Sequence, residues 1–329
     1  MIRGLLKKVA GGPDERAINL LAFGKHPGWG DHMPDLGTVS DRLIAFKQAL
    51  YTDGIGKNIN SGRWQEAEGR SIIPFDHWGV VLDTQQSWIL ARLWASRDGT
   101  TSGRSHYPFV VSAEAQNVSF DVAGPVVMAE IESLGAQCME ETEAGAVATE
   151  ISQGQSRIDQ IAQAAQRHKP SKVTAGGLAR AARAADAHDA HAGLVRLIYR
   201  LERDIPAYRL HSGKTGLGKV PKRPTGTLAY HIRVPRWADD ATAALNLWRG
   251  FCQEMVVSSV PLSIIAPNSH DWVDLIFGML TNEHLACLRL GLDALASTTD
   301  IPYEIDGGFD VAVDQLIIES KRLEGASAS

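Results

Sequence analysis

Residues 23–37, FGKHPGWGDHMPDLG, contain four glycines and two prolines within fifteen positions. Glycine adopts backbone conformations closed to other residues and proline fixes φ, so this stretch can form neither a continuous helix nor a regular strand. The apolar run before it, residues 18–24, is typical of a strand. The stretch after it has apolar residues at helical spacing, with Thr38 or Ser40 placed to cap a helix and Gly54 placed to end it. The sequence therefore predicts a glycine-rich turn that joins the first strand to the first helix.

The following stretches predict more strands and a second helix. Apolar residues at 79–83 and 87–96 are separated by a short polar turn and predict an antiparallel hairpin. Residues 107–114 predict a third strand, in which Pro108 is tolerated only near the start or at an edge. An apolar stripe at helical spacing predicts a helix over 126–142; it consists of Met128, Ile131, Leu134 and Cys138. We therefore expect an α/β fold of the α+β kind, with an antiparallel sheet flanked by helices.

Composition changes along the chain and predicts its organisation. The middle of the chain is rich in alanine, the best helix former, and predicts two helices broken around residues 169–177. A stretch rich in basic residues, glycine and proline follows and predicts a loop. The expected segments are a flexible leader (1–16), a first α/β domain (17–150), a helical segment (151–206), a basic loop (207–227), a second α/β unit (228–322) and a disordered tail (323–329). Within the second unit we expect a strand at 228–235, a helix at 237–259, a buried strand at 260–267 and one or two helices over 268–292.

Charge and cysteine content narrow the class of protein. The formal net charge is −5 and the pI is near 6.1, so there is no basic surplus to attract nucleic acid. No apolar run approaches the roughly 20 residues that a membrane-spanning helix needs. Cys138, Cys252 and Cys287 lie far apart in the sequence, which argues against a disulfide framework or a zinc knuckle. These features predict a cytoplasmic protein without an integral membrane segment.

One stretch partly matches a phosphate-binding loop. Residues 213–219, GKTGLGK, have the G-x-x-x-x-G-K spacing. Val220 stands where the motif needs a serine or threonine to hold magnesium, and Pro221 stands where a helix should begin. A basic linker is therefore the favoured interpretation, and a nucleotide-responsive scaffold is kept as an alternative.

The glycine-rich stretch itself offers imidazoles and carboxylates. His26, Asp31 and His32 are residue types that bind catalytic zinc or iron, so a metal-dependent hydrolase is a second alternative. Their spacing matches no metal motif, and aspartates in such turns commonly accept hydrogen bonds from nearby backbone amides. The sequence has no G-x-S-x-G, H-E-x-x-H or paired C-x-x-C motif. We therefore predict no catalytic residue, no cofactor and no metal ligand.

Two stretches of the chain resemble signatures of a known family. The first is FGKHPGWGDHM, with Gly24, Lys25, Pro27, Trp29, Gly30 and Asp31, and the second is SGRSHYPFVV, with Gly103, Arg104, Tyr107 and Pro108. Together they resemble the TagF/ImpM family associated with bacterial type VI secretion. The run VPLSIIAPN…LIFGML resembles, more loosely, the strand and helix that close that family's domain. This chain departs from the family pattern at His32 and Met33, and in the spacing between Arg104 and the proline.

The resemblance implies a cytoplasmic domain of the longin or profilin class and a regulatory role without enzymatic activity. Members of the family restrain assembly or firing of the secretion apparatus by binding other proteins, including a forkhead-associated scaffold. On this hypothesis the glycine-rich loop is a rigid docking surface that displays Lys25, His26, Trp29 and His32 outward. The alternative is that Gly24, Gly30 and Asp31 only shape the turn.

Overall fold

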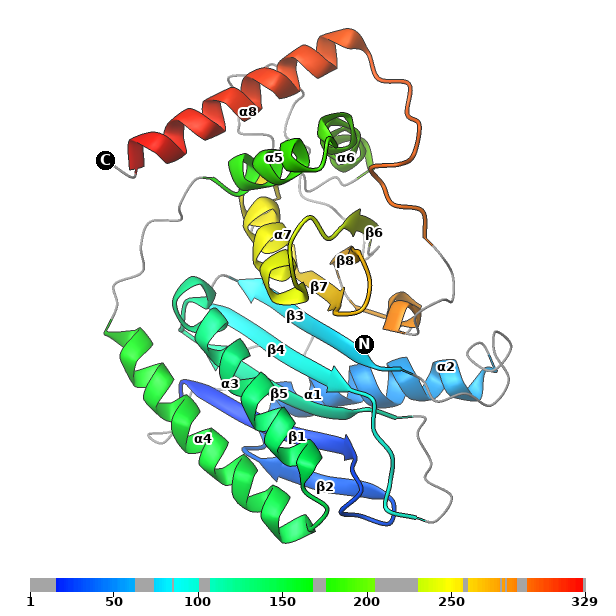
Figure 1. The fold of residues 1–329 in the computed structure, drawn as a ribbon, viewed down its shortest axis with the longest axis vertical. Coiled ribbons are helices and arrows are strands. Elements are labelled where there is room, and N and C mark those ends of the chain that lie inside the picture. Colours follow the sequence, from blue (N-terminus) through cyan, green and yellow to red (C-terminus); the bar gives the residue numbers. More distant parts are fainter. Residues whose placement is uncertain are drawn as a thin grey trace. The chain divides into compact units, whose positions relative to one another are not determined.

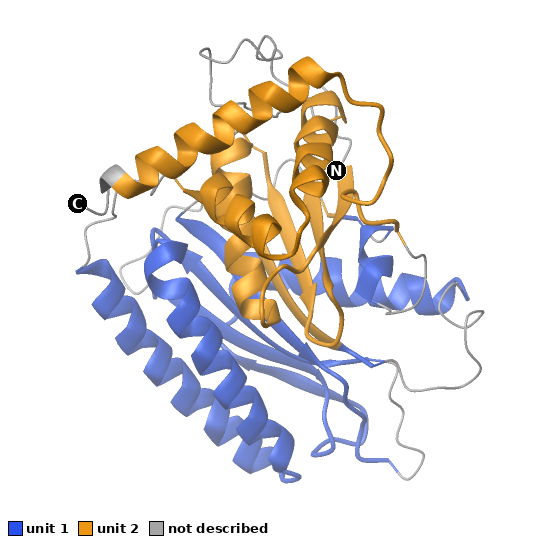
Figure 2. Ribbon diagram, turned by 45° about the horizontal axis from the view of Figure 1, so that its top comes forward, with its two compact units in different colours: residues 1–75, 85–169, 281–290 blue, residues 76–84, 170–280, 291–329 orange. Residues whose placement is uncertain are grey.

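The computed structural model describes most of the chain and divides it into two compact units (Figure 2). The described residues are 16–62, 74–84, 86–100, 107–167, 176–204, 230–256, 260–278, 280–281, 283–288 and 295–327. Unit 1 comprises residues 1–75, 85–169 and 281–290, and unit 2 comprises 76–84, 170–280 and 291–329. The expected leader, apart from Arg16, and the expected basic loop lie outside the described residues.

Unit 1 contains an antiparallel sheet with the strand order β2-β1-β5-β4 (Figure 1). The strands are β1 (Ile18–Lys25), β2 (His32–Gly37), β4 (Ser87–Trp94) and β5 (Phe109–Gln116). Strands β1, β4 and β5 are buried along nearly their whole length, because helices cover both faces of the sheet. The expected α+β class, with antiparallel strands flanked by helices, is confirmed.

The helices of unit 1 pack on the two faces of this sheet. They are α1 (Asp41–Lys47), a π-helical turn η1 (Gln48–Gly56), α2 (Lys57–Asn60), α3 (Phe120–Glu140), α4 (Ala144–Gln166) and a 3₁₀ turn η2 (His284–Leu288). Helices α3 and α4 lie side by side on one face, and α1 lies on the other (Figure 1). Of the two predicted caps, Thr38 and Ser40, it is Ser40 that caps α1, by accepting a hydrogen bond from the backbone N–H of Leu43.

Two expectations about the start of the chain are corrected. The glycine-rich loop does not lead directly into a helix, because β2 intervenes and pairs with β1, with Lys25 opposite His32. The loop is therefore the turn of a β1–β2 hairpin. The first helical stretch also does not end at Gly54 but runs on to Asn60. A Cβ at Gly54 would lie 2.4 Å from Cδ1 of Leu285, so the glycine serves close packing against η2.

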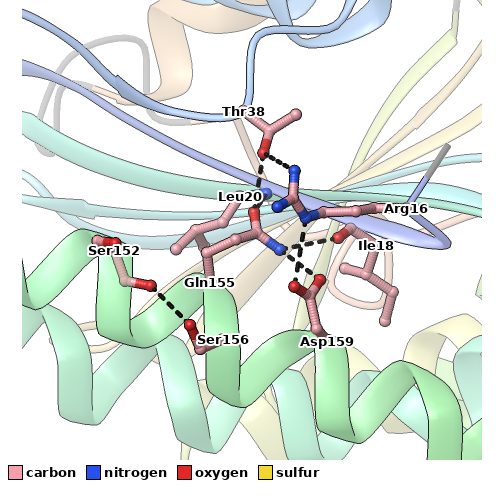
Figure 3. Close-up of polar contacts among 8 residues, drawn as sticks. All are labelled: Arg16, Ile18, Leu20, Thr38, Ser152, Gln155, Ser156 and Asp159. Carbon is pink, nitrogen blue, oxygen red and sulfur yellow. Dashed lines mark hydrogen bonds and ion pairs between the residues drawn. The ribbon is translucent and has the colours of Figure 1, made fainter. Parts of the chain in front are cut away.

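Helix α4 belongs to unit 1, which corrects the expected domain boundary at residue 150. Its apolar stripe, which includes Val147, Ile151 and Ile158, is buried against α3 and β1. Gln155 reaches from this helix to the start of β1, where β2 has ended (Figure 3). Its amide accepts from Leu20 N–H at 2.8 Å and donates to Ile18 C=O at 3.2 Å. The side chain thus takes the place of a missing strand partner.

Unit 2 contains four antiparallel strands in the order β3-β7-β8-β6 (Figure 1). Its strands are β3 (Asp76–Thr84), β6 (Tyr230–Pro235), β7 (Leu262–Pro267) and β8 (Trp272–Phe277), and its helices are α5 (Gly177–Ala187), α6 (His191–Asp204), α7 (Ala241–Met255) and α8 (Gly307–Ser327). Helix α7 packs on β7 and β3, and α5 packs on both α7 and α8. The hairpin expected at 79–83 and 87–96 therefore contributes β3 to unit 2 and β4 to unit 1.

Two further expectations about unit 2 are wrong. Residues 272–277 form strand β8 instead of a helix, because their one charged residue, Asp274, is buried against Arg233 on the neighbouring strand β6. The expected disordered tail begins inside α8, which continues to Ser327. Glu324 in that stretch pairs with Arg183 on α5 at 2.7 Å, which fixes the last turns of the helix. None of the helices in the described part of the chain is long and apolar enough to cross a membrane.

Candidate functional site

The two stretches that resemble family signatures meet at the end of β1. Gly24 has a φ of +120°, and a Cβ at this position would lie 2.1 Å from the carbonyl oxygen of Pro108. The backbone N–H of Lys25 donates to the same carbonyl at 3.1 Å. Only glycine allows the start of β5 to approach this closely. The glycine of the first stretch and the proline of the second therefore form one structural joint, although Gly103 and Arg104 lie outside the described residues.

The side chain of Lys25 lies between two carboxylates. Its Nζ is 2.5 Å from Oδ1 of Asp31 and 3.0 Å from Oδ2 of Asp98, and only 3% of the lysine side chain is exposed. A buried ammonium is stable only when it is paired and hydrogen-bonded. Asp98 follows β4, so this ion pair ties the β1–β2 hairpin to the segment after β4. Asp98 also accepts hydrogen bonds from the hydroxyl and backbone N–H of Thr100.

The two carboxylates differ in exposure. The hydrogen bond from Lys25, followed by that from His32, lowers the pKa of Asp31 to about 2. The hydrogen bond from the Thr100 hydroxyl, with that from Lys25, holds the pKa of Asp98 well below its usual range. Asp98 has no exposed side-chain surface, whereas 67% of the Asp31 side chain is exposed. Asp31 is thus an ionised carboxylate that the buried Lys25 holds in place and that is open to solvent.

An aromatic group adjoins this carboxylate. Nδ1 of His32 lies 3.1 Å from Oδ1 of Asp31, and the imidazole packs edge-on against Tyr51 and Tyr107. The two tyrosine rings lie 4.6 Å apart between centroids. Tyr51 comes from η1, and its buried hydroxyl forms no hydrogen bond with any residue that the structure describes. We call Lys25, Asp31, His32, Tyr51, Asp98 and Tyr107 the Asp31 cluster.

The loop between β1 and β2 is held by its own polar contacts. Nδ1 of His26 accepts from the Gly28 N–H at 3.1 Å, so its Nε2–H donates to the Cys138 carbonyl at 2.7 Å. A ring nitrogen that accepts a hydrogen bond carries no proton, and burial lowers the pKa of this imidazole in the same sense. The Trp29 carbonyl accepts from Gly99 N–H at 2.7 Å. These bonds fix the loop against α3 and against the segment that carries Asp98.

The exposure of these side chains differs from the expectation that Lys25, His26, Trp29 and His32 all point outward. Lys25 and His26 are buried and Trp29 is half-buried, whereas Asp31 and His32 are exposed. Gly30 is exposed as well, and Pro27 packs with its carbonyl against Gly99. Both nitrogens of His26 are engaged, so His26, Asp31 and His32 do not form the ligand set that a metal-dependent hydrolase would need.

Sequence reasoning missed Asp98 and Tyr51 as members of the cluster. Asp98 is fourth after the last residue of β4, and Tyr51 lies in η1, within the stretch that the sequence predicts to be helical. Neither residue carries a local motif that points to Lys25.

The loop at 213–219, on which the nucleotide-responsive alternative depends, lies outside the described residues. No protein-family model matches this chain, and no curated protein is similar enough to be matched to it.

Proposed function

We propose that this chain is a non-enzymatic cytoplasmic regulator of type VI secretion that acts by binding a partner protein through the Asp31 cluster. The single observation that supports the proposal is the joint between Gly24 and Pro108, which brings the two TagF/ImpM-like stretches together at one place. The family resemblance supplies the pathway and the class of partner.

The charges of the cluster favour docking over catalysis. The ammonium of Lys25 is committed to two carboxylates, and both nitrogens of His26 are engaged in hydrogen bonds. Asp31 is the one exposed charge in the group whose position is fixed by a buried partner. A rigid carboxylate beside a histidine and two tyrosines suits recognition of hydrogen-bond donors or basic side chains on a protein. A forkhead-associated scaffold of the secretion system is the partner that the resemblance implies.

The proposal is tested by co-purification from a bacterium that carries the secretion system. We expect the full chain to retain a secretion-system component, and Asp31→Lys to abolish that retention because it places a like charge beside Lys25 and reverses the exposed charge. Asp31→Asn keeps the shape of the side chain and should weaken retention by about tenfold, the loss expected for one charge-assisted hydrogen bond.

A matched control separates a local effect from a general loss of surface charge. Asp53 forms an ion pair with exposed Lys57 in the same unit, at 2.8 Å, outside the cluster. Asp53→Asn should leave retention unchanged. The proposal fails if Asp31→Lys, shown to be folded by circular dichroism, still retains the component, or if the chain's own genome carries no injection machinery.

A further inference from the structure

Unit 2 contains a cavity of about 610 Å³ that the proposed function does not use. It is lined by the turn before α6, by the first residues of α6, and by the segment 295–300. The end of β6 and the start of β8, which pair with each other, complete the lining. Its size falls within the roughly 300–1,000 Å³ that small-molecule sites occupy. Its lining includes the charged and aromatic residues Asp189, Arg196, Arg233, Trp237, Trp272 and Asp300.

The walls of this cavity are fixed by hydrogen bonds and close packing. Thr298 N–H donates to the Arg233 carbonyl at 2.8 Å, and the Arg196 guanidinium donates to the Thr299 carbonyl at 2.8 Å. A Cβ at Gly193 would lie 2.9 Å from Cβ of Thr299, so the glycine lets the segment 295–300 lie directly on α6. The cavity is therefore formed before any ligand arrives, which lowers the entropic cost of binding.

Two of the charges that line the cavity are neutralised within the protein. Arg233 forms a bidentate pair with buried Asp274, with both N–O distances at 2.9 Å. Asp271 pairs with Arg236 at 3.0 Å. The buried Arg233 is therefore committed to Asp274, whereas Asp271 is an exposed carboxylate whose charge is shared with Arg236.

Three other charges at the cavity have no ion-pair partner among the described residues. Arg196 is half-buried, and its guanidinium donates a hydrogen bond to a backbone carbonyl instead of a carboxylate. Asp300 accepts one bond from the hydroxyl of Thr299, and Asp189 forms no ion pair in the described part of unit 2. The cavity thus offers one cation on its wall and two anions at its rim. A ligand that carries both signs of charge is complementary to this arrangement.

Aromatic side chains provide the apolar part of the cavity. Trp272 stacks on Arg233, with the guanidinium carbon 4.5 Å from the ring centroid, and Trp237 packs against Trp248. Trp237 has a φ of +43° and Asp189 a φ of +51°, conformations that L residues rarely adopt. Strained backbone of this kind clusters at ligand-binding positions, where the surrounding structure holds it. Two strained residues therefore lie at the same cavity, one aromatic and one acidic.

We propose that this cavity binds a small aromatic zwitterion of the α-amino-acid class. The ligand's carboxylate pairs with Arg196, its ammonium group pairs with the rim carboxylates, and its ring packs on the tryptophans. The inference is independent of the proposed docking function, because every residue that carries it lies in unit 2.

Calorimetric titration of the full chain with three related probes tests the assignment. L-Phenylalanine carries both charges, 3-phenylpropionate lacks the ammonium group, and phenethylamine lacks the carboxylate. We expect L-phenylalanine to bind at millimolar concentration or below, and each of the other two to bind at least tenfold more weakly. Arg196→Gln should weaken L-phenylalanine and 3-phenylpropionate about tenfold and leave phenethylamine unchanged.

Two further variants keep the test decisive. Arg203→Gln removes an exposed arginine from the same helix outside the cavity and should bind all three probes as the wild type does. Asp300→Asn, on the exposed rim, should weaken the binding of L-phenylalanine and phenethylamine but not that of 3-phenylpropionate. This variant still tests the assignment if Arg196→Gln does not fold. The proposal is overturned if the wild type does not bind L-phenylalanine, or if neither folded cavity variant changes its affinity.

Discussion

Nζ of Lys25 lies 3.0 Å from Oδ2 of Asp98, a carboxylate that has no exposed side-chain surface and lies 73 residues further along the chain. The pair joins the end of β1 to the segment after β4, and these two places lie at the same end of the sheet because β1 and β4 both run antiparallel to β5 between them. Asp31 completes the arrangement from the solvent side. The local shape of the glycine-rich loop therefore depends on a contact that lies outside the loop.

Removal of the lysine charge should destabilise unit 1. Lys25→Met leaves the buried carboxylate of Asp98 without its cation, which is a costlier state than the absence of both groups. We expect the midpoint of thermal unfolding to fall by several degrees, and Lys25→Met with Asp98→Asn to recover part of that loss. Thermal unfolding followed by circular dichroism measures both.

The control for this prediction is an exposed ion pair. Lys57→Met breaks a pair with Asp53 whose side chains are about half exposed, and pairs of that kind contribute about 0–1 kcal/mol. An equal loss of stability in Lys57→Met and Lys25→Met would contradict the role assigned to the buried pair.

The low pKa of Asp31 predicts a dependence of stability on pH. Its pKa is lowered from 3.8 to about 2, chiefly by the hydrogen bond from Lys25, so the unfolded chain binds a proton more readily than the folded chain. The contribution of Asp31 to stability is therefore fully present above about pH 4 and is lost as the pH falls toward 2. Chemical unfolding at pH 5, 4, 3 and 2 should show a shallower acid loss in Asp31→Asn than in the wild type. Identical slopes in the two proteins would exclude this coupling.

Substitution of Gly24 should be among the most damaging changes at the loop. Gly24→Ala combines a positive φ with a Cβ placed 2.1 Å from the Pro108 carbonyl oxygen, so both strain and a clash arise. We expect a loss of more than about 2 kcal/mol in the free energy of unfolding, measured by urea denaturation. Gly30→Ala is the matched control, because nothing lies within 4 Å of a Cβ there and the change should cost less than about 0.5 kcal/mol.

Local sequence patterns predicted the elements whose stabilising contacts are themselves local. Short apolar runs located β4 and β5, and Ser40, one of the two predicted caps, bonds to a residue three positions away at the start of α1. Strand β2 was not predicted, because it contains Pro34 and buries only Met33 fully. This strand forms because it pairs with β1, and no sequence pattern within β2 indicates that pairing.

Long-range contacts account for the larger differences between the structure predicted from the sequence and the structure observed. Asp274 interrupts an apolar run and favours an amphipathic helix, yet it lies in β8, where burial raises its pKa but hydrogen bonds from His231 and Arg233 on β6 outweigh that effect and lower it. The partners of Asp274 lie 43 and 41 positions away in the sequence. Local sequence alone therefore could not predict that this carboxylate is buried within a strand. The glycine-rich stretch was identified as a candidate site, but the cluster around Asp31 includes Asp98 and Tyr51 because of tertiary packing alone.

Gln155 should contribute to stability through the backbone groups that it pairs. Gln155→Ala leaves the N–H of Leu20 and the C=O of Ile18 without their hydrogen bonds in a buried position (Figure 3). The expected loss is about 1–3 kcal/mol, with faster hydrogen exchange at the Leu20 amide. Ser156→Ala, one residue along the same helix, removes only an exposed bond to the Ser152 carbonyl and should change stability by less than about 0.5 kcal/mol. Unchanged exchange at Leu20 in Gln155→Ala would refute this role.

The hydroxyl of Tyr51 gives a prediction of the opposite sign. It is buried and has no hydrogen-bond partner among the described residues, and burial is the main reason that the pKa of this phenol is raised. A buried hydroxyl without a partner costs about 1–3 kcal/mol, so its removal should help the folded state. Tyr51→Phe keeps the ring contacts with Phe23, His32 and Tyr107. We expect the free energy of unfolding to rise by about 1 kcal/mol, measured by urea denaturation.

A second tyrosine supplies the control for this change. The hydroxyl of Tyr303 accepts a hydrogen bond from Arg200 at 2.6 Å, so Tyr303→Phe should lower stability by about 0.5–1.5 kcal/mol. The same chemical change is thus expected to act in opposite directions at the two sites, because one hydroxyl has a partner and the other does not. If Tyr51→Phe destabilises the chain as much as Tyr303→Phe does, the hydroxyl of Tyr51 has a partner in solution, and the aromatic part of the Asp31 cluster is more open to solvent than its packing indicates.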